Sequence, residues 1–225
     1  MAMLTSEQIT DLRRIDSPTI ANAIETFKVR PRVQGYVGYD IRTIFEDLPA
    51  TVGYAVTCTV DSTTEGREGI GFQKLYEILE DAPKPAIVVM QDVGTDRLHS
   101  CHAGEVMSTT MKRLGAVGIL TDGGLRDVRE VRALGGFQYF CAGLVVSHGN
   151  PICVSVNTEV TISGMVVKPG DLLHGDINGI VMIPDEIAGQ VADAARETWV
   201  REEVTMRNIV SPGFTFKQQT EEIQH

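Results

Sequence analysis

The segment from Gly115 to Gly136 constrains the fold of this chain more than any other part of its sequence. The apolar run Ala116–Leu120 is short and continuous, which is typical of a strand buried on both faces. It leads into a glycine-containing loop at 121–126, and a helical pattern then runs from about 127 to 134 and stops at two glycines. A buried strand that passes directly into a helix predicts an α/β protein.

Hydrophobic periodicity predicts the same alternation over much of the chain. Strands are expected at 52–60, 86–90 and 139–146, and helices at 17–27, 69–80 and 105–114. The first helix is expected to have Ser17 as its N-cap and Pro18 at its first position. Two hairpins, at 160–167 and 171–183, and a long helix from about 184 to 208 follow. The pattern predicts a single mixed α/β domain over residues 1–225, with about 209–225 as a tail or oligomer arm.

Charge and composition exclude several classes of partner. The formal net charge of −10 argues against a nucleic-acid surface, which needs a basic footprint. The polar N-terminus is unlike a secretion or transit signal, and no apolar run reaches the roughly 18 residues of a membrane span. The four cysteines lack C-x-x-C spacing, which favours reduced, buried thiols. We therefore expect a cytoplasmic protein that acts on a small molecule and binds neither nucleic acid nor membrane.

Polar side chains gather where the strand at 116–120 approaches the following helix. In open α/β sheets, ligands bind beyond the carboxyl ends of the strands, where helix N-termini and turn amides also favour anions. Asp127 and Glu130 share one face of the helix, and Arg126 precedes them. Carboxylates beside an arginine suit a hard divalent cation together with an anionic substrate. The alternative is structural, because the helix macrodipole alone favours acidic residues in a first turn.

The histidines and lysines are weaker candidates. His99, Cys101 and His102 lack the fourth ligand of a zinc site, whereas His102 is close enough to Glu105 to line a substrate pocket. Surface or turn positions are expected for two other histidines, His148 and His174. The lysines with distinctive neighbours do not suit a Schiff base: Lys84, Lys112 and Lys168. The segment TDGG lacks the rest of a phosphate-binding P-loop.

Three stretches of this sequence resemble a known family. Glu105 stands 21 positions before Arg126, which Asp127 follows, and this matches an acidic residue, twenty intervening residues and Arg-Asp. The flanking GAVGILTDGGLRD and the later MVVKPGDLLHGDINGIVMIP are also similar. The chain resembles, from about Asp16 to Glu203, the class II pyruvate aldolases that act on 4-hydroxy-4-methyl-2-oxoglutarate and 4-carboxy-4-hydroxy-2-oxoadipate. Their relatives include the regulator of ribonuclease activity A.

The resemblance implies roles for individual residues. In such aldolases the aspartate of Arg-Asp binds Mg²⁺ or Mn²⁺ and the arginine contacts the pyruvate unit, which implies these roles for Asp127 and Arg126. The preceding acid supports the metal through its water shell, which implies Glu105. Backbone amides that bind the substrate carboxylate would come from Gly104, Glu105, Val106 and Met107.

The resemblance also implies a fold and an assembly. The family has a single-domain β/β/α swivelling-type fold and forms a homotrimer or a dimer of trimers. An acid near the C-terminus would enter the site of a neighbouring subunit, and both Glu202 and Glu203 are open for that role.

The expected activity is divalent-metal-dependent cleavage of 4-hydroxy-2-oxo acids, of the 4-hydroxy-4-methyl-2-oxoglutarate type, to pyruvate and a second carbonyl compound. Oxaloacetate decarboxylation is expected as a side activity, because it passes through the same enolate. Two alternatives stay open. One is a non-catalytic, protein-binding regulator of ribonuclease activity, since a shared scaffold does not fix function. The other is a lyase of the same family that acts on another sugar-derived oxo acid.

Overall fold

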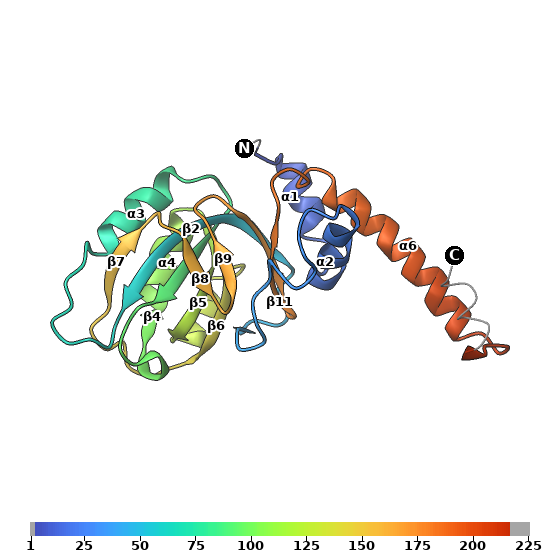
Figure 1. Ribbon diagram of the computed structural model, residues 1–225. Helices are drawn as coiled ribbons and strands as arrows, with labels where there is room; N and C mark the ends of the chain where they lie inside the picture. Colours follow the sequence, from blue (N-terminus) through green and yellow to red (C-terminus); the bar gives the residue numbers. More distant parts are fainter. Residues whose placement is uncertain (1–2, 217–225) are drawn as a thin grey trace.

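A computed structural model describes residues 3–216 and shows a mixed sheet flanked by helices (Figure 1). In this part of the chain the sheet has nine strands, seven of them in the order β1-β6-β5-β3-β2-β10-β11, while β4 pairs with β5 and β7 with β2. The strand bounds are β1 Arg42–Thr43, β2 Thr51–Asp61, β3 Ala86–Asp92, β4 Cys101–Ala103, β5 Ala116–Leu125, β6 Gln138–Leu144, β7 Ile152–Val156, β10 Leu172–Asp176 and β11 Gly179–Ile183. Strands β2, β3, β5 and β6 are parallel to one another, whereas β1, β7, β10 and β11 pair antiparallel.

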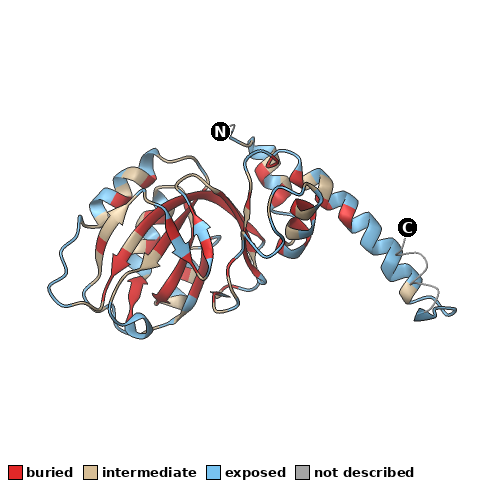
Figure 2. Cartoon of the chain, in the orientation of Figure 1, coloured by how far each residue is buried: buried red, intermediate tan, exposed pale blue. Residues whose placement is uncertain are grey.

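The central strands are buried on both faces, as Figure 2 shows by their colour. One face packs against α3 (Phe72–Asp81), α4 (Glu105–Arg113) and α5 (Val128–Ala133), which insert Leu75, Met111 and Val131 into the core. The hairpin β8 (Val160–Ile162) and β9 (Met165–Val167) covers the other face. Full burial of such a side chain contributes about 1.5–3 kcal/mol, so this double cover favours a fixed sheet behind the candidate site.

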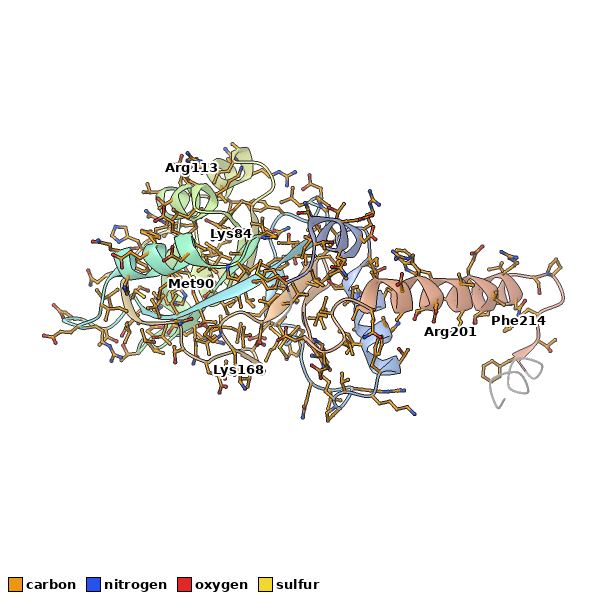
Figure 3. The ribbon with its side chains drawn as sticks, turned by 90° about the horizontal axis from the view of Figure 1, so that it is seen from above. Lys84, Met90, Arg113, Lys168, Arg201 and Phe214 are labelled. Carbon is orange, nitrogen blue, oxygen red and sulfur yellow. The ribbon has the colours of Figure 1, made fainter. Side chains whose placement is uncertain are left out.

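A helical cluster occupies the other end of the molecule. Helices α1 (Ser6–Leu12), α2 (Ser17–Thr26) and the first half of α6 (Val191–Ile209) pack on β2, β10 and β11. From Trp199 onward α6 is exposed and extends away from the body, as Figures 1 and 3 show from two directions. Val200, Val204 and Met206 on this part of the helix are each more than half exposed.

Most predicted elements are confirmed, including both hairpins and four buried, unpaired cysteines. Ser163 and Gly164 both have positive φ, as a two-residue hairpin turn requires. Four expectations were wrong. The N-cap of α2 is Asp16, whose carboxylate accepts from the Thr19 amide, and α6 begins only at Val191. His174 is buried in β10 and is neither a surface nor a turn residue.

The fourth difference concerns the segment predicted as a glycine loop. Residues 121–125 belong to β5, because they pair with β6 on one side and with β4 on the other. The register shifts between Thr121 and Gly124, so this end of the strand is irregular.

No helix within residues 3–216 is long and apolar enough to cross a membrane. Part of the predicted tail, 217–225, lies outside the described residues.

Candidate active site

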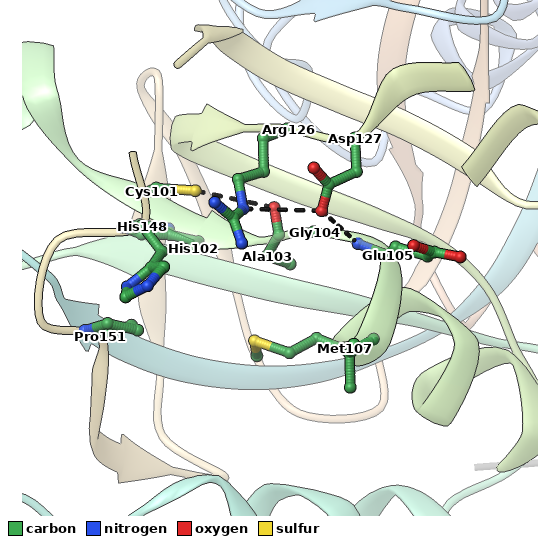
Figure 4. Close-up of a pocket in the computed structure, with 11 residues that line it drawn as sticks. Cys101, His102, Ala103, Gly104, Glu105, Met107, Arg126, Asp127, His148 and Pro151 are labelled. Atoms are coloured by element: carbon green, nitrogen blue, oxygen red, sulfur yellow. Dashed lines mark hydrogen bonds and ion pairs between the residues drawn. The ribbon is translucent and has the colours of Figure 1, made fainter. Parts of the chain in front are cut away.

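Two chain segments meet at the carboxyl ends of β4 and β5 and enclose a small cavity. Its volume is about 180 Å³, and Figure 4 shows its lining. One wall is the segment that runs from β4 into α4, and the other is the pair Arg126-Asp127 between β5 and α5. The lining residues are Cys101, His102, Ala103, Gly104, Glu105, Val106, Met107, Arg126, Asp127, His148 and Pro151. The structure thus brings together the residues that the sequence separates by about twenty positions.

Asp127 is held in an unusual backbone conformation. Its φ of 59° and ψ of 43° are left-handed, which aspartate tolerates better than most residues. The side chain does not cap its own helix α5. Instead, Oδ2 accepts a hydrogen bond of 2.9 Å from the backbone amide of Glu105, the first residue of α4. One carboxylate oxygen therefore joins the two walls of the cavity.

Gly104 makes this approach possible. A Cβ at position 104 would collide with Oδ2 of Asp127, and it would also come within 3.0 Å of Arg126 Cγ and Nε. Any larger residue would therefore push the carboxylate and the guanidinium out of place. The glycine is required for close packing, since its own φ of −140° is open to every residue.

Arg126 is fixed by three contacts. Its amide donates to the carbonyl of Ala103 at 3.2 Å, its Nη1 donates to the carbonyl of Val146 at 3.4 Å, and its Nε lies 3.6 Å from Asp127 Oδ2. One third of the side chain is exposed, so the remaining donors of the guanidinium fork can reach a ligand in the cavity.

The first turn of α4 supplies backbone donors. The amides of Val106 and Met107 fall among the first four of the helix, which have no partner within it, while Glu105 N–H already binds Asp127. An anion in the cavity would meet these donors and the positive end of the helix dipole. The Glu105 carboxylate is exposed and points away from Asp127 in Figure 4.

His102 differs from its expected role. It belongs to the cavity wall, but its ring is fully buried and turned into the core. The ring contacts Thr121 Oγ1 at 2.6 Å and Asp92 Oδ2 at 2.8 Å. Burial alone would raise the pKa of Asp92, but the hydrogen bonds of His102 and Ser100 outweigh it and the pKa lies below its usual value.

Sequence reasoning missed four lining residues: Cys101, Ala103, His148 and Pro151. His148 is exposed in the loop after β6, as expected, but the fold brings that loop over the cavity. Cys101 lies opposite Arg126, and burial raises the pKa of its thiol. No local sequence pattern identifies either residue. His148 joins the cavity wall only because the loop after β6 returns to the site.

Three acidic candidates lie elsewhere. Glu130 is exposed and does not line the cavity. Glu202 and Glu203 lie on the exposed half of α6, at the other end of the molecule (Figure 1). Glu202 accepts from Asn22 at 3.2 Å and Glu203 from Arg207 at 2.7 Å. Within one chain they do not join the site.

The donor set suits a hard divalent cation with few protein ligands. No group of three or more His, Cys, Asp or Glu that could hold a metal occurs among residues 3–216. Mg²⁺ usually keeps several waters and binds through one or two carboxylates together with the substrate. The Asp127 carboxylate, one third exposed, fits that mode, and Glu105 could add an outer contact through water.

The fold and the site together define a mixed α/β protein whose small cavity, lined by Arg126, Asp127 and the first turn of α4, lies beyond its parallel strands. The sequence model described as RraA-like, Aldolase/RraA, matches residues 17–182. The chain therefore belongs to the RraA-like family, whose description names both aldolases and RraA.

Individual relatives are distant. Protein DlpA of Legionella pneumophila is 23% identical over 166 residues, 73% of this chain, and the match spans only 26% of DlpA. A Halalkalibacterium halodurans protein named "Putative 4-hydroxy-4-methyl-2-oxoglutarate aldolase" is 28% identical over 148 residues, 65% of this chain and 69% of that protein. The crystal structure of Streptomyces coelicolor RraAS2, described as an unusual member of the RNase ES inhibitor RraA family, superposes with a TM-score of 0.70 at 24% identity, over 92% of this chain and 98% of that one. This similarity confirms the expected single-domain fold.

Proposed function

We propose that the protein is a divalent-metal-dependent lyase that cleaves 4-hydroxy-2-oxo acids to pyruvate and a second carbonyl compound. The observation that carries the proposal is the convergence of Arg126, Asp127 and the first amides of α4 on one small cavity. A carboxylate, a guanidinium and free helix amides at a strand end match the needs of a chelating, anionic 2-oxo acid. A helix cap alone would not need the guanidinium and the amides to face the same cavity.

Each residue of the site would have its own role in the reaction. A divalent metal held by Asp127, with Glu105 in its water shell, would supply Lewis-acid stabilisation of the enolate oxygen. Arg126 donates a charge-assisted hydrogen bond to that oxygen as its charge grows. The amides of Val106 and Met107 orient the C1 carboxylate. A water held by the carboxylates of the site takes the 4-hydroxyl proton, C4 becomes the second carbonyl as the C3–C4 bond breaks, and the electron pair of that bond forms pyruvate enolate. A proton added to C3 then gives pyruvate, and oxaloacetate would form the same enolate by losing CO₂.

A second cavity next to the site would hold the part of the substrate that becomes the second carbonyl compound. It has a volume of about 570 Å³ and lies along the loop 144–150, whose His148 lines the first cavity. Within residues 3–216 its lining has no lysine or arginine, and its ionisable side chains are Asp96 and His99, whose Oδ2 and Nδ1 lie 2.7 Å apart. This favours an uncharged, hydroxylated second half, as in a sugar-derived oxo acid, over a second carboxylate.

We also propose that the protein acts as a homo-oligomer, a trimer or a dimer of trimers. The second half of α6 exposes Val200, Val204 and Met206 beyond the body of the chain. A neighbouring subunit would cover this surface and would receive Glu202 or Glu203 near its own cavity.

The test is a pyruvate-release screen with Mg²⁺ or Mn²⁺ over oxaloacetate and 4-hydroxy-2-oxo acids with charged or neutral second halves. We expect release from at least one 4-hydroxy-2-oxo acid, its loss with EDTA, and its recovery with either metal. Full turnover by metal-stripped protein would contradict the metal dependence. Absence of pyruvate release from the whole panel would favour a protein-binding regulator.

A further inference from the structure

A chain of buried hydrogen bonds lies directly behind the candidate site. The amide of Gly123 donates to Thr121 Oγ1 at 3.0 Å, and Thr121 Oγ1 lies 2.6 Å from His102 Nδ1. On the other side of the ring, Nε2 lies 2.8 Å from Asp92 Oδ2, and Asp92 Oδ1 accepts from the amide of Gly94 at 2.9 Å. The side chains of His102, Thr121 and Asp92 are at most 2% exposed.

The chemistry of these groups determines which atom donates and which accepts in each hydrogen bond of this series. An ionised Asp92 carboxylate can only accept hydrogen bonds, so Nε2 of His102 donates to it. In a neutral ring Nδ1 is then an acceptor, to which the Thr121 hydroxyl donates, while the oxygen of that hydroxyl accepts from the Gly123 amide. A neutral ring with its proton on Nε2 therefore gives each linked atom a partner. Such satisfied networks are rigid, because breaking one link leaves a buried polar group without a bond.

Gly123 leaves space for the imidazole ring of His102. A Cβ at position 123 would lie 2.7 Å from Cε1 and 2.8 Å from Nε2 of His102. The TDGG stretch, which the sequence presents as a possible phosphate loop, thus has a packing role at its first glycine. Any side chain at this position would therefore displace the ring from its contact with Thr121.

The network joins the two walls of the cavity from behind. His102 lies in β4, two residues before Gly104, and Thr121 lies in β5, whose end is followed by Arg126 and Asp127. β4 has three residues and pairs with β5 alone, across a register irregularity. Few backbone bonds therefore fix it, and the ring adds a link to β5 and another to Asp92 at the end of β3.

We propose that His102 is a positioning residue, which holds the amides of residues 104–107 at a fixed distance from Arg126 and Asp127 through the buried chain Gly123–Thr121–His102–Asp92. The inference rests on the proposed function for its catalytic consequence. Its structural part, the fixed relation of the two cavity walls, is independent of any substrate.

The test compares Thr121→Val with Thr57→Val. Thr57 is a matched control, because it is also fully buried and its hydroxyl donates to the Thr158 carbonyl at 2.5 Å, on β2 and outside the site. Both variants should lose similar stability. Only Thr121→Val should weaken binding of oxalate in the presence of Mg²⁺ and lower kcat, each by about 10–100-fold, the usual cost of removing a partner that orients a site. Binding is measured by titration calorimetry.

A second pair of variants distinguishes loss of positioning from misfolding. His102→Gln keeps a donor for Asp92 Oδ2, whereas His102→Leu removes the donor of the ring, so the glutamine variant should recover part of the loss. Values for Thr121→Val within about twofold of wild type in both kcat and oxalate affinity would overturn the proposal.

The positioning role can be tested even if the proposed function fails. Should the wild type bind no oxalate and release no pyruvate, amide hydrogen exchange at residues 104–107 replaces these readouts. Faster exchange in Thr121→Val than in Thr57→Val would support the positioning role. Equal exchange in the two variants would refute it.

Discussion

The carboxylate of Asp127 accepts a hydrogen bond from the backbone amide of Glu105, with 2.9 Å between Oδ2 and N. The two residues are 22 positions apart in the chain, and this bond links the start of α5 to the start of α4. Asp127 therefore has two separable duties: it fixes the two walls of the cavity, and its charge is available to a cation there.

Asp127→Asn should separate these duties. The amide side chain keeps an oxygen for the Glu105 N–H but loses the charge, so we expect loss of Mg²⁺ binding and of pyruvate release with near wild-type thermal stability. Asp127→Ala should lose both, with an added stability loss of about 1 kcal/mol, as for removal of a helix cap. Glu130→Gln, on the same helix but outside the cavity, is the control. Wild-type turnover in Asp127→Ala would contradict the whole site.

Arg126→Lys should preserve metal binding and reduce catalysis. Lysine keeps the charge but not the planar fork, so it cannot hold Val146 and a ligand oxygen together. If the guanidinium acts mainly on the enolate, kcat should fall by about 10²–10³-fold with a smaller change in KM. Arg129→Lys, an exposed neighbour, should leave both constants unchanged. A folded Arg126→Lys protein with wild-type kcat would disprove the role of Arg126.

Gly104→Ala should inactivate the protein without unfolding it. The added methyl group would collide with Oδ2 of Asp127, so the carboxylate must leave the Glu105 amide. We expect weaker Mg²⁺ binding by calorimetry and a stability loss of about 1–3 kcal/mol, typical of overpacking. Gly143→Ala is the control, since a Cβ there meets no atom within 4 Å. Equal metal affinity in both variants would show that this close approach is not needed.

Removal of an α6 acid should impair turnover through the assembly. Among the described residues Glu203 pairs with Arg207 of its own helix, whereas Glu202 contacts Asn22 of α2. Glu203 is thus freer to enter a neighbouring cavity, and Glu203→Gln should lower kcat more than Glu202→Gln at unchanged thermal stability. Light scattering accompanies the kinetics. A fully active monomer at micromolar concentration would contradict the shared site.

Stability should fall as the pH drops below about 6.5, in part because of His174. Burial lowers the pKa of this ring, although Asp176 and Asp16 raise it in part, and its nitrogens contact Ser17 Oγ and the Leu12 carbonyl at 3.0 Å. The unfolded chain therefore takes up the proton first, so this contribution is complete above the ordinary value of 6.5 and is lost as the pH falls below it. Urea midpoints from pH 7.5 to 5 should show a shallower decline in His174→Asn. Parallel curves would refute the assignment.

Local sequence determined which secondary structure forms in most of the chain. The apolar run at 86–90 and the Ser163-Gly164 turn depend on residues within a few positions of one another, and both are found as predicted. These features are visible in the sequence because periodicity and turn chemistry act over short distances. The segments that form the cavity were identified in another way, by the family resemblance that Glu105 and Arg126-Asp127 carry.

Tertiary structure alone decided where the site's side chains point. The ring of His102, expected in the pocket, is turned into the core because Thr121 and Asp92 satisfy both of its nitrogens and Gly123 leaves it room. His148 enters the cavity wall only because its loop returns there after β6. Side-chain direction depends on strand register and on partners far away in the sequence, and no local pattern encodes either.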